Sequence, residues 1–167
     1  MNSTQSLIRE LEQEAATTRR LLAIVPTEKL EWAPHAKSMT LGQLAMHIAN
    51  IPGNVTKMIH SDGMDVRNAK FAPPQPKSTE EIVSSFDSAM ENAVEILKSW
   101  DEVHAGGPWR MSKGEEEVFT LPRTAVARTI MLNHWYHHRG QLTVYLRLLD
   151  VPLPVTYGRS ADTNPFA

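Results

Sequence analysis

The sequence predicts an all-α protein, an up-and-down four-helix bundle with irregular connecting loops. Two observations lead to this prediction. Four long segments repeat their apolar residues with the spacing of an amphipathic helix, and stretches rich in proline and glycine separate these segments. The chain has 167 residues, a length typical of one domain, so we expect residues 1–167 to form a single helical bundle domain.

The first two helices are expected over residues 4–25 and 40–60. Pro26 ends the first, because proline lacks the amide hydrogen that a helix interior needs. Thr40 is expected to be the N-cap of the second helix, with Gln43 completing a capping box three residues later.

Pro52 and Gly53 predict a kink or an interruption inside the second helix. A long loop over residues 61–77 follows, with three prolines close together near its end. The third helix is expected over residues 78–100, where residues 78–81 have the sequence of a second capping box.

Residues 101–120 form a second irregular stretch that contains several glycines. Within it, residues 109–111 and 117–119 are candidates for two short strands. The last and longest helix is expected over residues 122–149, with a proline in its first turn. No regular element is expected in the tail over residues 151–167.

The composition excludes several functions. A net charge of −2 and a pI near 6.4 argue against a nucleic-acid-binding surface. The chain has no cysteine, which excludes disulfides, cysteine-ligated zinc, iron–sulfur clusters and a cysteine nucleophile. No apolar stretch approaches the roughly 20 residues of a membrane span, and no secretory signal is visible. We therefore expect a cytoplasmic protein that binds neither nucleic acid nor membrane.

Three of the histidines lie near the middle of the last predicted helix. His134 and His138 are four residues apart and share one face with an apolar stripe, so both should face the bundle interior. His137 is three residues after His134 and is an alternative partner, which spacing alone does not distinguish from His138. His47, on the core face of the second helix, is the natural third imidazole.

Three neutral imidazoles can hold a divalent metal ion and leave coordination positions open, as catalytic zinc sites do. Such an ion can polarise a substrate oxygen, lower the pKa of water or activate a thiol. The competing interpretation is that these residues are core histidines satisfied by hydrogen bonds, because partly buried histidines are common in proteins without metals.

Several known site patterns are absent from the sequence. Trp135 follows His134, where a zinc peptidase of the His-Glu-x-x-His type needs glutamate. No histidine has a glutamate three residues before it, which excludes the pattern of di-iron bundles. The Gly-x-Ser-x-Gly and P-loop motifs are also missing. The sequence therefore indicates a mononuclear site, and it names no catalytic acid or base.

Residues 134–142, His-Trp-Tyr-His-His-Arg-Gly-Gln-Leu, resemble the His-x-x-x-His-Arg-Gly-Gln signature of the DinB-like (DinB/YfiT) family. Residues 39–49 resemble the first histidine segment of that family, and residues 121–124 and 145–152 resemble the two ends of its last helix. Residues 157–162 are similar to its C-terminal Tyr-Gly-Pro-Ser-Ala-Asp, with arginine where proline is common. The similarity covers nearly the whole chain.

The resemblance implies a four-helix bundle of DinB/YfiT type, often a homodimer, with one divalent metal ion held by His47, His134 and His138. It thus selects His138 over His137. Nickel and zinc are the ions most associated with such sites. Some relatives are thiol-cofactor-dependent transferases, and one is a mycothiol-dependent maleylpyruvate isomerase. A low-molecular-weight thiol is therefore a candidate second cofactor, and the substrate is an unknown small molecule.

Other residues of the last helix are candidates to support this site. Asn133, Gln141 and Tyr145 are near enough along the helix to orient the imidazole rings. Arg139 points away from the histidine pair by about 100° and is expected to serve a carboxylate, the tail or a dimer partner. The tail at residues 160–162 is expected to fold back over the mouth of the site.

Two functions agree with these observations. The first is a metal-dependent enzyme that activates water or a low-molecular-weight thiol for hydrolysis or transfer to a small electrophile, with residues 61–77 and 101–120 shaping the substrate pocket. The alternative is a non-catalytic metal-binding stress or damage-inducible protein. In that protein the ion is sequestered, or it holds the second helix against the last.

Overall fold

The computed structural model describes residues 3–69 and 72–164. Four long helices dominate it: α1 (Ser3–Leu22), α2 (Leu41–His60), α3 (Thr79–Lys98) and α6 (His134–Leu148). The shorter elements are α4 (Glu102–Gly106), α5 (Arg123–Val126), β1 (Gly63–Asp65), β2 (Pro108–Lys113) and β3 (Glu116–Pro122). Two single 3-10 turns, η1 and η2, cover Thr27–Lys29 and Val66–Asn68, and a π-helical segment, η3, covers Ala127–Asn133.

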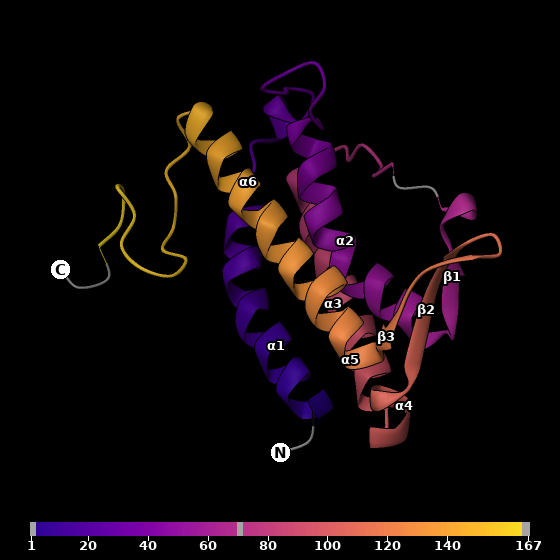
Figure 1. The fold of residues 1–167 in the computed structure, drawn as a ribbon. Helices are drawn as coiled ribbons and strands as arrows, with labels where there is room; N and C mark the ends of the chain where they lie inside the picture. Colours follow the sequence, from indigo (N-terminus) through magenta and orange to yellow (C-terminus); the bar gives the residue numbers. More distant parts are fainter. Residues whose placement is uncertain (1–2, 70–71, 165–167) are drawn as a thin grey trace.

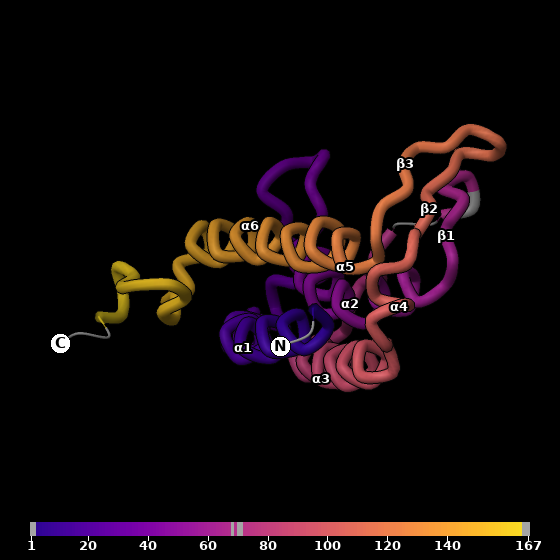
Figure 2. The backbone as a smooth tube through the Cα atoms, turned by 60° about the horizontal axis from the view of Figure 1, so that its bottom comes forward, coloured from indigo at the N-terminus to yellow at the C-terminus, as the bar shows by residue number. Residues whose placement is uncertain are grey.

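The long helices pack side by side as a bundle, as the apolar spacing predicts (Figure 1). Helix α2 contacts both α3 and α6, and α1 contacts α3 and α6 (Figure 2). The segments α5, η3 and α6 run on without a break, because the residues at both junctions keep right-handed helical dihedral angles. The core lies between the helices, and its largest fully buried side chains include Leu11, Ile48, Phe86 and Trp135.

Helix α2 begins as predicted and then continues through its proline. The Thr40 hydroxyl accepts from the Gln43 amide, and the Gln43 side chain accepts from the Thr40 amide, which completes the capping box. The sequence predicted a kink or an interruption at Pro52, and the interruption is wrong, since α2 is helical from Leu41 to His60. Proline cannot donate to the carbonyl four residues earlier, which belongs to Ile48. That carbonyl instead accepts a 3.0 Å hydrogen bond from the Trp135 indole of α6.

Helices α2 and α3 approach each other closely at Gly53. A Cβ atom at this position would lie 3.0 Å from the backbone oxygen of Ala89. At the start of α3, the Ser78 hydroxyl caps the Glu81 amide. The Glu81 carboxylate accepts from the Lys77 amide rather than from Ser78, so only half of the second predicted capping box forms.

A three-stranded sheet corrects the all-α prediction. Its order is β1-β2-β3, with β1 parallel to β2 and β2 antiparallel to β3. The short strands expected at 109–111 and 117–119 lie within β2 and β3, and Gly114 supports their turn with a φ of +68°. Strand β1 was not expected, because three residues carry no periodic pattern. The chain is therefore a helical bundle with a small sheet at one end (Figure 1).

Arg123 joins this sheet to the bundle. Its side chain is 4% exposed and donates to the backbone oxygens of Ile59, Ser61 and Pro108 and to the Asp62 carboxylate. The guanidinium thus satisfies carbonyls at the C-terminus of α2 and at the start of β2. Arg123 itself directly follows the last residue of β3. This contact sets where the last helical segment begins relative to α2.

None of the helices within residues 3–69 and 72–164 combines the length and apolar character that crossing a membrane needs.

Candidate metal centre

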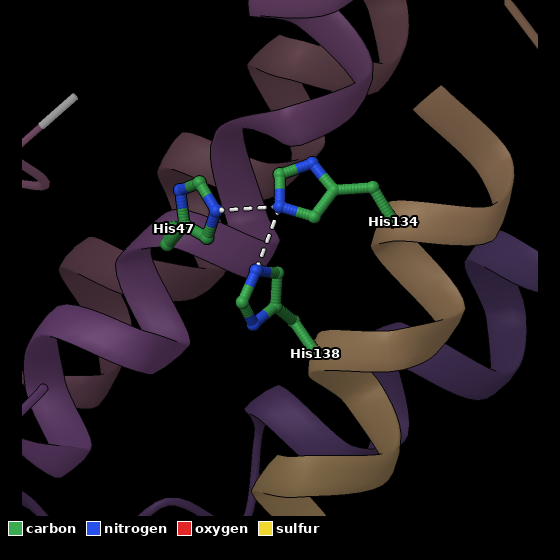
Figure 3. Close-up of side chains that lie close together, drawn as sticks. All are labelled: His47, His134 and His138. Carbon is green, nitrogen blue, oxygen red and sulfur yellow. Dashed lines mark hydrogen bonds between the residues drawn. The ribbon is translucent and has the colours of Figure 1, made fainter. Parts of the chain in front are cut away.

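Three imidazoles from two helices meet where α2 faces α6 (Figure 3). His47 comes from α2, and His134 and His138 come from successive turns of α6. The Nε2 atom of His134 lies 2.7 Å from Nε2 of His138 and 3.4 Å from Nε2 of His47. One ring nitrogen from each of the three lies within 4.8 Å of the other two. The geometry therefore aims three nitrogen donors at one small volume.

Two of the rings have a hydrogen bond that fixes their tautomer. Nδ1 of His138 lies 2.6 Å from the Gln141 amide oxygen, to which it donates. The His134 ring donates to the backbone of Ile130, a contact that raises its pKa and opposes the effect of burial. Each ring therefore presents the Nε2 lone pair to the cluster. The Nε2 lone pairs of His134 and His138 repel each other at 2.7 Å unless a proton or a cation lies between them. Nitrogen lone pairs that face each other in this way are suited to bind a metal ion.

The π-helical segment η3 contributes to this arrangement. The His134 amide donates to Met131 and not to Ile130, the acceptor of a regular α-helix. The Ile130 carbonyl can thus serve the His134 ring. π-Helical turns occur often at functional sites, and here the π-helical segment ends at Asn133, directly before His134.

Burial favours the neutral form of all three imidazoles. Loss of water around the ring is the main cause in each, and it lowers the pKa of His47 to about 4, with repulsion from His138 and His134 adding to it. The pKa values of His134 and His138 are lowered for the same main reason. Because a metal ligand must be deprotonated, these side chains need lose no proton to bind an ion at pH 7.

The structure separates residues that sequence spacing left equivalent. His137 is exposed and is not part of the cluster, so His138 is the partner of His134. Among the supporting candidates, Gln141 contacts His138. Tyr145 instead hydrogen-bonds the Met39 carbonyl and packs against Trp32, and Asn133 is exposed.

Arg139 binds a carboxylate, that of Glu14, and a residue of the tail, Tyr157. These are two of the three roles that the sequence left open. Arg139 is 3% exposed and pairs with Glu14 of α1 at 2.6 Å, and it also contacts the hydroxyl groups of Thr18 and Tyr157. The expected folding of the tail over the site is wrong. Asp162 instead binds Arg147 and the Leu153 amide, so the tail lies beside the C-terminal end of α6 (Figure 1).

A cleft of about 500 Å³ adjoins the histidine cluster. His47 and His134 form part of its wall, and residues 72–74 of the loop before α3 form another part. The first predicted loop, residues 61–77, thus contributes residues 72–74 to this cleft, whereas none of residues 101–120 lines it. Sequence reasoning missed Asn54 and Lys57, which also line it. The sequence could have indicated them, because Asn54 and Lys57 follow His47 on the same helix at intervals of two and about three turns.

Comparisons with known proteins agree with this fold. The family model of the DinB family matches residues 1–164, so the chain belongs to that family. The uncharacterized protein YrdA of Bacillus subtilis (strain 168) is 25% identical over 93% of this chain and 88% of its own length. A DinB-like protein of Bacillus cereus ATCC 10987 superposes with a TM-score of 0.69 at 22% identity, covering 92% of this chain and 97% of that one.

A second solved structure has the same fold. The DinB-like protein YjoA of Bacillus subtilis gives a TM-score of 0.69 at 18% identity, covering 90% of this chain and 96% of its own. At such identities these structures establish the fold alone, because one fold carries many activities.

Proposed function

We propose that this protein is a metal-dependent enzyme in which His47, His134 and His138 hold one divalent ion. The observation that carries the proposal is the convergence of three neutral Nε2 donors beside a cleft. Within residues 3–69 and 72–164, no fourth histidine or carboxylate joins that group. Three protein ligands leave positions for a substrate, as catalytic sites do.

The chain's own residues have defined roles in this proposal. Gln141 and the Ile130 carbonyl hold the rings in the tautomer that a metal requires. The cleft places a small molecule against His47 and His134. When bound, the ion supplies Lewis-acid activation of water or of a low-molecular-weight thiol for hydrolysis or transfer to a small electrophile.

Nickel or zinc is the ion that we propose. Imidazole nitrogen suits both metals, and no thiolate or carboxylate in the group favours a softer or harder ion. The thiol cofactor is part of the same proposal and is tested with the enzyme activity.

The decisive experiment measures bound metal per chain on untagged protein. We expect close to one ion in the native protein and in His137→Ala, and much less in His47→Ala, His134→Ala and His138→Ala. His137→Ala is the matched control, since it removes an exposed imidazole from the same helix. A reaction between a thiol and an electrophile that the native protein catalyses and His134→Ala does not would then support the proposal of an enzyme. Absence of metal after supply of nickel, zinc and manganese contradicts the proposal.

A non-catalytic role for the ion is the second candidate, because the cluster bridges α2 and α6. An ion that only holds these helices together contributes much of the folding free energy. Metal-free protein would then melt far below the metal-loaded form. Similar melting temperatures, together with thiol turnover, favour the enzyme.

We propose further that two copies associate through the outer face of α6. Val144 and Leu148 lie one turn apart there and are 57% and 59% exposed, so two large apolar side chains adjoin each other on one exposed face of the helix. Sedimentation equilibrium is expected to give a dimer, and Val144→Glu with Leu148→Glu a monomer. A native monomer contradicts this part of the proposal.

A further inference from the structure

We propose that the cleft beside the histidine cluster binds an elongated apolar molecule that carries a carboxylate or similar anionic group, and that Lys57 pairs with that group. This inference rests on the proposed function, because it names the substrate class for the same site. In this proposal Lys57 determines which ligands bind and takes no part in the chemical reaction.

The walls of the cleft favour an apolar body. Met46, Ile51, Val55 and Met58 contribute to them from α2, Ile130 from η3, and Pro73 and Pro74 from the facing loop. Contact with these side chains removes apolar ligand surface from water, which stabilises binding. Methionine also adapts to ligands of different shape, so the walls select apolar character more than one outline.

The charge of the cleft favours an anion. Lys57 is exposed, and among the residues that the structure describes no carboxylate is within ion-pair distance of it. The described lining contains no aspartate or glutamate. The lysine ammonium is thus an unneutralised cation at the edge of an apolar surface.

The other polar side chains of the cleft are less suited to that role. Asn50 donates to the Met46 carbonyl and accepts from the Ser85 hydroxyl, so both ends of its amide are engaged. Asn54 is exposed one turn before Lys57 and is neutral. It can add a hydrogen bond but not a charge.

The spacing on α2 sets the length of the ligand. Lys57 is ten positions after His47, and ten helical residues rise about 15 Å. Helical side chains lean toward the N-terminus of the helix, and the lysine stem is longer than the His47 side chain, so its ammonium group reaches further in that direction and shortens this span. A molecule that reacts at the histidines and reaches Lys57 must therefore be about 10–15 Å long.

The test uses a probe with a metal-binding group at one end and a carboxylate at the other. Isothermal titration of zinc-loaded protein compares suberic monohydroxamic acid with its primary-amide analogue. We expect the native protein to prefer the acid about fivefold, the upper range for an exposed ion pair. Lys57→Met is expected to bind both probes equally, and Lys57→Glu to prefer the amide. Lys98→Met is the matched control, because Lys98 is also exposed in the last turn of a long helix.

The outcomes separate this inference from the proposed function. Equal binding of acid and amide by the native protein, or a preference that persists in Lys57→Met, overturns the role of Lys57 while leaving the metal site intact. Failure of both hydroxamates to bind zinc-loaded protein contradicts an open metal site. In that case, titration of metal-free protein with octanoate and octanamide, followed by NMR, decides the inference alone. A preference for octanoate that Lys57→Met abolishes supports it, and no preference overturns it.

Discussion

Gln141 lies outside the histidine cluster but determines which nitrogen of the His138 imidazole carries the hydrogen. Its amide oxygen accepts from Nδ1 of His138, which leaves Nε2 free of hydrogen. We predict that Gln141→Ala lowers metal affinity about 10- to 100-fold, the usual effect of removing a group that orients a ligand. Gln141→Glu, a stronger acceptor, should retain or raise the affinity. Competition with a chelator measures both.

Asn133→Ala is the control for this prediction, since Asn133 is an exposed amide on the same helical segment. Its affinity should equal that of the native protein. Equal affinities in Gln141→Ala and Asn133→Ala would show that the contact with His138 does not orient the ring for metal.

At the scale of single residues, the sequence predicts which side chains can meet and the structure decides which do. Helical spacing brings His134 near both His137 and His138, because residues three and four apart share a face. Only the direction of α2 relative to α6 distinguishes them, and that direction depends on contacts distant in sequence. For the same reason the sequence offered Asn133, Gln141 and Tyr145 equally, although only Gln141 reaches an imidazole of the cluster.

At the scale of elements, Pro52 and Trp135 align the two helices that carry the cluster. Pro52 leaves the Ile48 carbonyl without its helical donor, and the Trp135 indole donates to it. Ile48 adjoins His47 in sequence and Trp135 adjoins His134. We predict that Trp135→Phe lowers the free energy of unfolding by about 1–3 kcal/mol for the unsatisfied carbonyl, in addition to the effect of lost volume. Urea denaturation measures the change.

Pro52→Ala separates the hydrogen bond from the lost volume. Alanine supplies an amide that can pair with the Ile48 carbonyl inside the helix. Trp135→Phe should therefore cost less in the Pro52→Ala background than in the native one, and a double-mutant cycle gives the difference. Additive changes would show that the indole contributes only packing.

The helices were predictable because each is long and strongly periodic, and two of the three strands were expected, but β1 and its pairing were not. Strand β1 has three residues, and its partner β2 is more than 40 residues away, so its pairing depends on where Arg123 and the end of α2 bring the chain. The interruption predicted at Pro52 failed for a related reason. The donor that replaces the missing amide comes from another helix.

At the scale of the whole molecule, Glu14 and Arg139 connect α1, α6 and the tail. Arg139 is 3% exposed and Glu14 is 12% exposed, so removing one partner leaves a buried charge unpaired. We predict that Glu14→Ala lowers the free energy of unfolding by about 3–5 kcal/mol. Asp87→Ala breaks the Arg19–Asp87 pair, in which both side chains are about half exposed, and should cost far less than Glu14→Ala. Equal costs in urea denaturation would contradict the importance of burial.

The tail gives stability a dependence on pH that can be tested at Asp162. The ion pair with Arg147, helped by the Leu153 amide, lowers the pKa of this carboxyl in the folded protein. A carboxyl with a lowered folded pKa stabilises the protein above its unfolded pKa of about 3.9, and this contribution is lost as pH falls through the folded pKa. Asp162→Asn should therefore be less stable than the native protein at pH 7 and approach it below about pH 4. Arg147→Met should remove most of this difference, since the carboxylate then loses its main partner. A difference between Asp162→Asn and the native protein that stays constant from pH 3 to pH 8, measured by urea denaturation, would mean that the tail is held without this charge.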